Sequence, residues 1–169
     1  FPLLREPRSR INIFDFSEEI QSRAIWTISN IFRYQDPLRV SDIADLSQVL
    51  LKVMENSKND GIIADGISTF MYILQNPGQG ITDYLGFHTG IIKECIKLLG
   101  KEKCKYETDV TTGSENQNKD QEGSLKMNSK IYKLCLRVIG HFLSEPEEST
   151  KLVLDAGFLD VIEPYACLL

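Results

Sequence analysis

The sequence contains a helical pattern that recurs three times, and this repetition constrains the fold more than any other feature. Trp26, Ser68 and Arg137 can be placed in one register. Apolar residues then occupy the positions one before, two after and six after each of them: Ile25, Ile28, Phe32, Ile67, Phe70, Leu74, Leu136, Ile139 and Leu143. Steps of three and four residues place side chains on one face of an α-helix. We therefore expect three equivalent helices, each with one buried face.

Helical spacing is found in the other apolar blocks as well, and no stretch alternates with a period of two for long enough to form a sheet. The sequence therefore predicts an all-α protein. We expect N-caps at Ser17 and Ser41, and turns with positive φ at Gly90 and Gly157. The expected helices cover residues 17–32, 40–54, 61–74, 91–99, 129–143 and 147–154, with a last one after Gly157.

The distance between repeats identifies the kind of helical protein. The first two copies are 42 residues apart and the last two are 69 apart. The excess falls in a charged and polar tract at 101–128, in which residues 111–124 include no apolar side chain. Such a segment cannot bury enough surface to offset its ordering entropy. We expect one α-solenoid domain over 1–169, of armadillo or HEAT type, with a flexible insertion at 101–128 in the third repeat.

Polar and aromatic residues lie on the side of each helix opposite the apolar face. The only tryptophan, Trp26, falls on this side and lies four residues before Asn30. An alternative is that Trp26 packs against a neighbouring helix, that Asn30 is an ordinary surface amide and that His141 is a surface imidazole. We expect the following side chains to point outward: Trp26, Asn30, Arg33, Asp65, Ser68, Tyr72, Arg137 and His141.

Side chains of these types suit the binding of an extended peptide. An asparagine offers both a donor and an acceptor to a peptide backbone. The face of an indole attracts the stem and the charged head of a lysine or arginine, with a cation–π contribution of about 0.5–2 kcal/mol. The acidic side chain of Asp65 adds a further contact for a cation. We therefore expect a basic, extended peptide as the partner.

The composition and the motifs disfavour several classes of partner and of function. The formal net charge is -5 and the pI is near 5.1, which disfavours nucleic acid and anionic membranes as partners. No apolar run reaches the length of a membrane-spanning helix. The four cysteines show no CxxC spacing, and no catalytic, phosphate-binding or metal-binding motif is present. Only two histidines are available as bases near neutral pH. We expect neither an enzyme nor a cofactor or metal.

Three segments resemble the armadillo repeats of the importin-α family. The segment SRAIWTISNIFR at 22–33 resembles the third helix of such a repeat, in which Trp and Asn lie four residues apart. Asp65 with Tyr72 resembles the next repeat, and residues 135–162 resemble the one after it. The resemblance implies a right-handed armadillo solenoid of about three central repeats. It also implies a nuclear-import adaptor found in the cytoplasm and the nucleus.

The resemblance also assigns roles to the outward residues. Trp26 and Asn30 would close the major site for nuclear localisation signals, with Arg33 beside it, and Asp65 and Tyr72 would line the path of a signal's linker. Arg137 and His141 would open the minor site. Signal-bearing cargo is then the expected partner. Importin-β is a second one, although the basic segment through which the family binds it does not occur in these 169 residues.

Two positions depart from the family pattern and keep a second function open. Ser68 stands where the family usually has tryptophan, and His141 where it usually has asparagine. One slot for a basic side chain and one clamp for the peptide backbone are therefore missing. These losses favour the alternative, in which the chain is an armadillo scaffold in another assembly and does not recognise signal peptides.

Overall fold

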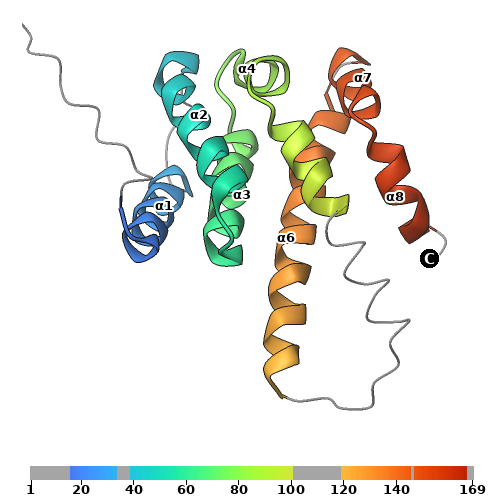
Figure 1. The fold of residues 1–169 in the computed structure, drawn as a ribbon. Coiled ribbons are helices and arrows are strands. Elements are labelled where there is room, and N and C mark those ends of the chain that lie inside the picture. Colours follow the sequence, from blue (N-terminus) through green and yellow to red (C-terminus); the bar gives the residue numbers. More distant parts are fainter. Residues whose placement is uncertain (1–15, 34–38, 101–118, 146, 167–169) are drawn as a thin grey trace, which may run out of the picture.

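The computed structural model describes residues 16–33, 39–100, 119–145 and 147–166. These residues form eight helices and no strand, so the all-α prediction is confirmed for this part of the chain (Figure 1). One helix starts at residue 91 and is described through residue 100. The other helices are α1 (Glu18–Arg33), α2 (Val40–Asn56), α3 (Asp60–Gln75), α4 (Ile81–His88), α6 (Lys119–Leu143), α7 (Glu147–Asp155) and α8 (Phe158–Ala166).

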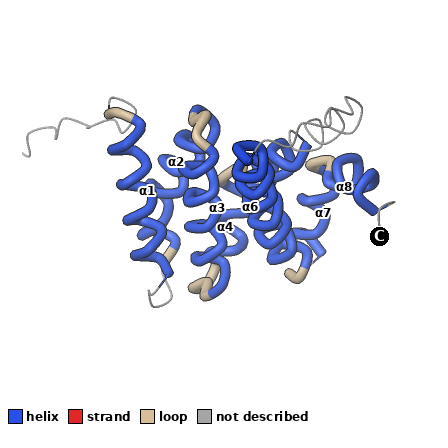
Figure 2. The backbone as a smooth tube through the Cα atoms, turned by 90° about the horizontal axis from the view of Figure 1, so that it is seen from below, coloured by secondary structure: helices blue, strands red, loops and turns tan. Residues whose placement is uncertain are grey.

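Three helices form a row with α3 at its centre. α3 packs against α1 on one side and against α6 on the other. α2, α4 and α7 lie along one side of this row, above it in Figure 1, and the view from below in Figure 2 shows the same succession of helices. The row contains the three helices that the repeated register predicted to be equivalent. Their outward positions can therefore belong to one continuous surface.

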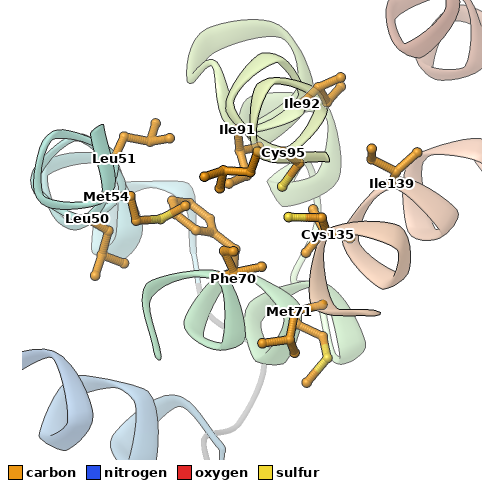
Figure 3. Close-up of a cluster of buried hydrophobic side chains, with 14 of the residues drawn as sticks. Leu50, Leu51, Met54, Phe70, Met71, Ile91, Ile92, Cys95, Cys135 and Ile139 are labelled. Carbon is orange, nitrogen blue, oxygen red and sulfur yellow. The ribbon is translucent and has the colours of Figure 1, made fainter. Parts of the chain in front are cut away.

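The interior is built around Phe70 at the centre of α3. Phe70 is completely buried, and Met54 of α2 and Cys95 of the helix at 91–100 are buried with it (Figure 3). Most of the apolar register positions are buried as well, including Ile25, Ile67, Leu74 and Ile139. Leu143 is an exception, since it is 38% exposed at the end of α6. Ile28, Phe32 and Leu136 are half-buried and pack against the core, so the apolar pattern located the core and its border.

Gly66 allows α2 and α3 to approach closely. A Cβ atom at this position would lie 2.8 Å from Cγ and 2.9 Å from Sδ of Met54. Any larger residue would therefore displace a buried side chain. This contact fixes the distance at which α2 packs on α3.

Glycine turns connect successive helices where they were expected. Gly90, before the helix at 91–100, has φ of 131°, and Gly157, between α7 and α8, has φ of 85°. Both lie in the positive-φ region that side chains other than glycine rarely adopt. These two predictions are confirmed.

Several helix boundaries differ from expectation. α4 was not predicted, and α2 begins at Val40 instead of after an N-cap at Ser41. Asp42 accepts a hydrogen bond from the backbone N–H of Arg39 at 3.2 Å, so the helix begins with a cap formed by the Arg39–Asp42 pair. Hydrogen bonding by the Arg39 side chain, together with this backbone contact, lowers the pKa of Asp42.

α6 also starts earlier than the expected helix at 129–143. It begins at Lys119, so residues 119–128 of the expected insertion are helical. Lysine, glutamine and glutamate favour helices even without an apolar face, and this propensity was not considered in the prediction. Residues 101–118, the rest of the predicted insertion, lie outside the described residues. Among the described helices, none is long and apolar enough to cross a membrane.

Candidate functional site

The outward residues of α1, α3 and α6 are linked to one another by contacts between the helices. Arg33 of α1 contacts Tyr72 of α3, and Asp65 of α3 faces Lys130 of α6. We call the surface that they form the ridge. It consists of Trp26, Asn30, Arg33, Asp65, Tyr72, Lys130, Arg137 and His141.

Trp26 lies at the α1 end of the ridge and is 60% exposed. The prediction that it points away from the core is therefore confirmed. Asn30 is half-buried, and its Nδ2 donates a hydrogen bond to the carbonyl oxygen of Trp26 at 2.9 Å. One amide hydrogen is thus used within the helix, while an asparagine has a second hydrogen and a carbonyl oxygen to offer. An indole face and an amide therefore lie side by side on one helix.

Arg33 and Tyr72 form the contact between α1 and α3. Nη2 and Nε of Arg33 donate hydrogen bonds to the hydroxyl oxygen of Tyr72 at 2.9 and 3.2 Å. Cζ of the guanidinium lies 5.1 Å from the centroid of the tyrosine ring. Both interactions hold the guanidinium against α3, with its positive charge on the ridge.

Asp65 is the acidic member of the ridge. Burial raises the pKa of its carboxyl group, while the positive charges of Lys130 and Arg33 oppose the shift. Lys130 Nζ lies 3.9 Å from Asp65 Oδ1, a long ion pair. Sequence reasoning did not select Lys130. It lies seven residues before Arg137, two helical turns away on the same face, and this spacing was the available signal.

Ser68 does not belong to the ridge, so the prediction that it points outward was wrong. It is 8% exposed, and its hydroxyl donates a hydrogen bond to the carbonyl oxygen of Ala64 at 2.8 Å. A serine side chain is short, and the central helix α3 has a neighbour on each side. The side chain is covered by these neighbours and satisfies its polar group on its own helix.

Arg137 and His141 lie at the α6 end of the ridge. Arg137 is exposed and His141 is half-buried. They line a shallow depression of about 250 Å³ between α3 and α6, together with Met71, Gln75, Gly140 and Ser144. The structure thus brings seven of the eight predicted residues to one surface and assigns Ser68 to the interior.

Comparisons with known proteins do not identify the chain. No protein-family model matches the sequence, and the comparison with curated proteins gives no match. A function must therefore be argued from the ridge itself. In the described part of the chain, no group of three or more His, Cys, Asp or Glu side chains is arranged to hold a metal ion.

Proposed function

We propose that the ridge binds an extended basic peptide, and that the chain is part of a nuclear-import adaptor related to importin-α. In this proposal α1, α3 and α6 are the third helices of three armadillo repeats in a right-handed solenoid. The row of three helices supports this arrangement, since each contributes residues to the same surface. The peptide would cross the row at an angle to the helix axes and contact each helix in turn.

The observation that carries the proposal is the exposure of Trp26. An indole that is 60% exposed leaves a large apolar face in water, although burying it would be favourable by about 25 cal/mol per Å². Asn30, one turn later, can hydrogen-bond to a peptide backbone while the indole covers a lysine or arginine side chain. A basic peptide would use both groups at once.

A second candidate is a scaffold that binds another protein through the same row. Two observations favour it. Ser68 is buried where a second indole would be needed. The ridge also carries three permanent cations, Arg33, Lys130 and Arg137, against the single carboxylate of Asp65. This charge does not attract a uniformly basic partner along its whole length.

Binding of labelled peptides tests the proposal. We expect a lysine- and arginine-rich peptide to bind the whole chain with an affinity that falls as salt concentration rises. Fluorescence anisotropy of the peptide should show weaker binding by the Trp26→Ala variant, by about three- to thirtyfold. The intrinsic fluorescence of the single tryptophan should change on binding to the unaltered chain.

Phe87→Ala is the matched control, since Phe87 is an exposed aromatic residue of α4, outside the ridge. This variant should bind like the unaltered chain. Equal losses in the Trp26 and Phe87 variants would contradict the proposal, as would the absence of any salt-sensitive binding. Absence of basic-peptide binding would favour the scaffold.

A further inference from the structure

The charges at the centre of the ridge are paired, whereas the charge at its α6 end is not. At the centre, the carboxylate of Asp65 interacts with both Arg33 and Lys130. At the α6 end, Arg137 is exposed and forms no ion pair with any described residue. We propose that the depression at Arg137 and His141 binds an anionic side chain, a phosphate ester or a carboxylate. The anion would belong to the same extended peptide, so the inference rests on the proposed function.

The side chains around the depression suit an anion. Arg137 has five N–H donors in a planar fork, the geometry that matches phosphate and carboxylate oxygens. Gln75 can donate through its amide from the opposite helix, α3. His141 lies one helical turn after Arg137 and can donate from its imidazole. Met71, which is buried, forms an apolar part of the lining.

Two other features limit what the depression can do. The hydroxyl of Ser144 donates to the carbonyl oxygen of Gly140 at 2.9 Å, so its hydrogen is already used. The depression also lies near the carboxyl end of α6, where the helix dipole weakly opposes an anion. The guanidinium of Arg137 must therefore supply most of the attraction. A cationic peptide side chain would meet repulsion from the same group.

The spacing between the two ends defines the peptide. Packed helices lie about 8–10 Å apart, so α1 and α6 are separated by about 16–20 Å across α3. An extended chain advances about 3.3 Å per residue. The anionic residue should therefore lie about five or six positions from the basic residue that covers Trp26.

Three peptides of one sequence test the inference with the whole chain. Each has a lysine-rich segment and, six residues away, a serine, a phosphoserine or a glutamate, and a second set reverses the order of the two ends. We expect the phosphoserine peptide of one set to bind about tenfold more tightly than its serine counterpart, with the glutamate peptide in between. Without a site, a phosphate would weaken binding to a chain of net charge -5.

Arg137→Gln should abolish the gain in affinity that the phosphate gives. Lys93→Gln is the control, since it makes the same change of charge at an exposed position of the helix at 91–100. The inference is overturned if phosphorylation gives no gain in either set, or if both variants reduce the gain equally. Different results would contradict the proposed function, namely that the serine peptide does not bind or that its binding does not depend on Trp26.

A measurement without any peptide makes the test independent of the proposed function. Titration with inorganic phosphate should shift the NMR signals of the His141 imidazole and the Gly140 amide, and Arg137→Gln should remove these shifts. Shifts of equal size in the Arg137 variant would overturn the inference.

Discussion

The interior around Phe70 and the ridge are built in opposite ways. In the interior, Phe70, Met54, Cys95 and Cys135 are nearly or completely buried. On the ridge, Trp26 is mostly exposed, and the polar groups are joined by a few contacts between helices. The comparison indicates that the residues that stabilise the fold are separate from those available to a partner. Substitutions in one region should therefore leave the property of the other region unchanged.

The largest expected effect comes from removing the centre of the interior. Phe70→Ala should lower the free energy of unfolding by about 3–5 kcal/mol, because a completely buried aromatic side chain leaves a cavity. Trp26→Ala should lower it by less than about 1 kcal/mol. Denaturation with urea, followed by circular dichroism, measures both values. If Trp26→Ala lowers the free energy of unfolding as much as Phe70→Ala, the indole stabilises the fold. The ridge would then not be separate from the residues that stabilise the interior.

A smaller effect is expected at two helical glycines. Gly66→Ala should cost about 1 kcal/mol, since displacement of buried Met54 outweighs the helix-propensity gain of alanine. Gly140→Ala should instead stabilise the chain by about 0.5–1 kcal/mol, because a Cβ there meets no atom within 4 Å. Thermal unfolding of the two variants compares them directly. If Gly66→Ala stabilises the chain as Gly140→Ala does, the close contact between α2 and α3 is not as described.

The pH dependence of stability tests the burial of the thiols. A hydrogen bond with Cys135, together with burial, raises the pKa of the Cys95 thiol well above its ordinary value, and Figure 3 shows the two sulfur atoms pointing toward each other. The unfolded chain ionises this thiol near pH 8.5, so stability present below that pH is lost as pH rises toward the higher folded pKa. One thiol contributes a slope of at most about 1.4 kcal/mol per pH unit.

Urea unfolding at several pH values between 7 and 10 measures this slope. The unaltered chain should lose stability with rising pH more steeply than Cys95→Ala. Burial also raises the pKa of Tyr132, which titrates in both proteins, so the difference between the two slopes isolates the thiol. Equal slopes would contradict the burial of Cys95 as a protonated thiol.

The sequence was sufficient to predict the helical class, most of the core and seven ridge residues. Steps of three and four residues determine which side of a helix is apolar, and so Ile25, Ile67 and Phe70 were correctly placed. The same register could not distinguish Ser68 from Trp26. Exposure at an outward position depends on the length of the side chain, and tryptophan is much longer than serine. It also depends on how many helices pack beside the position, and α3 packs between α1 and α6.

Other features depended on information that apolar periodicity does not contain. The early start of α6 at Lys119 rests on helix propensity, and the cap of α2 rests on a side-chain contact between Arg39 and Asp42. The pairing of Arg33 with Tyr72 joins residues 39 positions apart, so it became visible only in the folded chain. The role of each ridge residue in binding is still a prediction.

We propose that Trp26 and the residues of α3 and α6 beside it form one peptide-binding surface. Two-dimensional NMR of the ¹⁵N-labelled chain is the sharpest test, with stepwise addition of a peptide that has a lysine-rich segment followed by a neutral one. We expect the indole N–H signal of Trp26 and the amide signals around Tyr72 and Arg137 to shift together along one binding curve. Shifts confined to α7 and α8, or an indole signal that stays in place while the peptide binds, would contradict it.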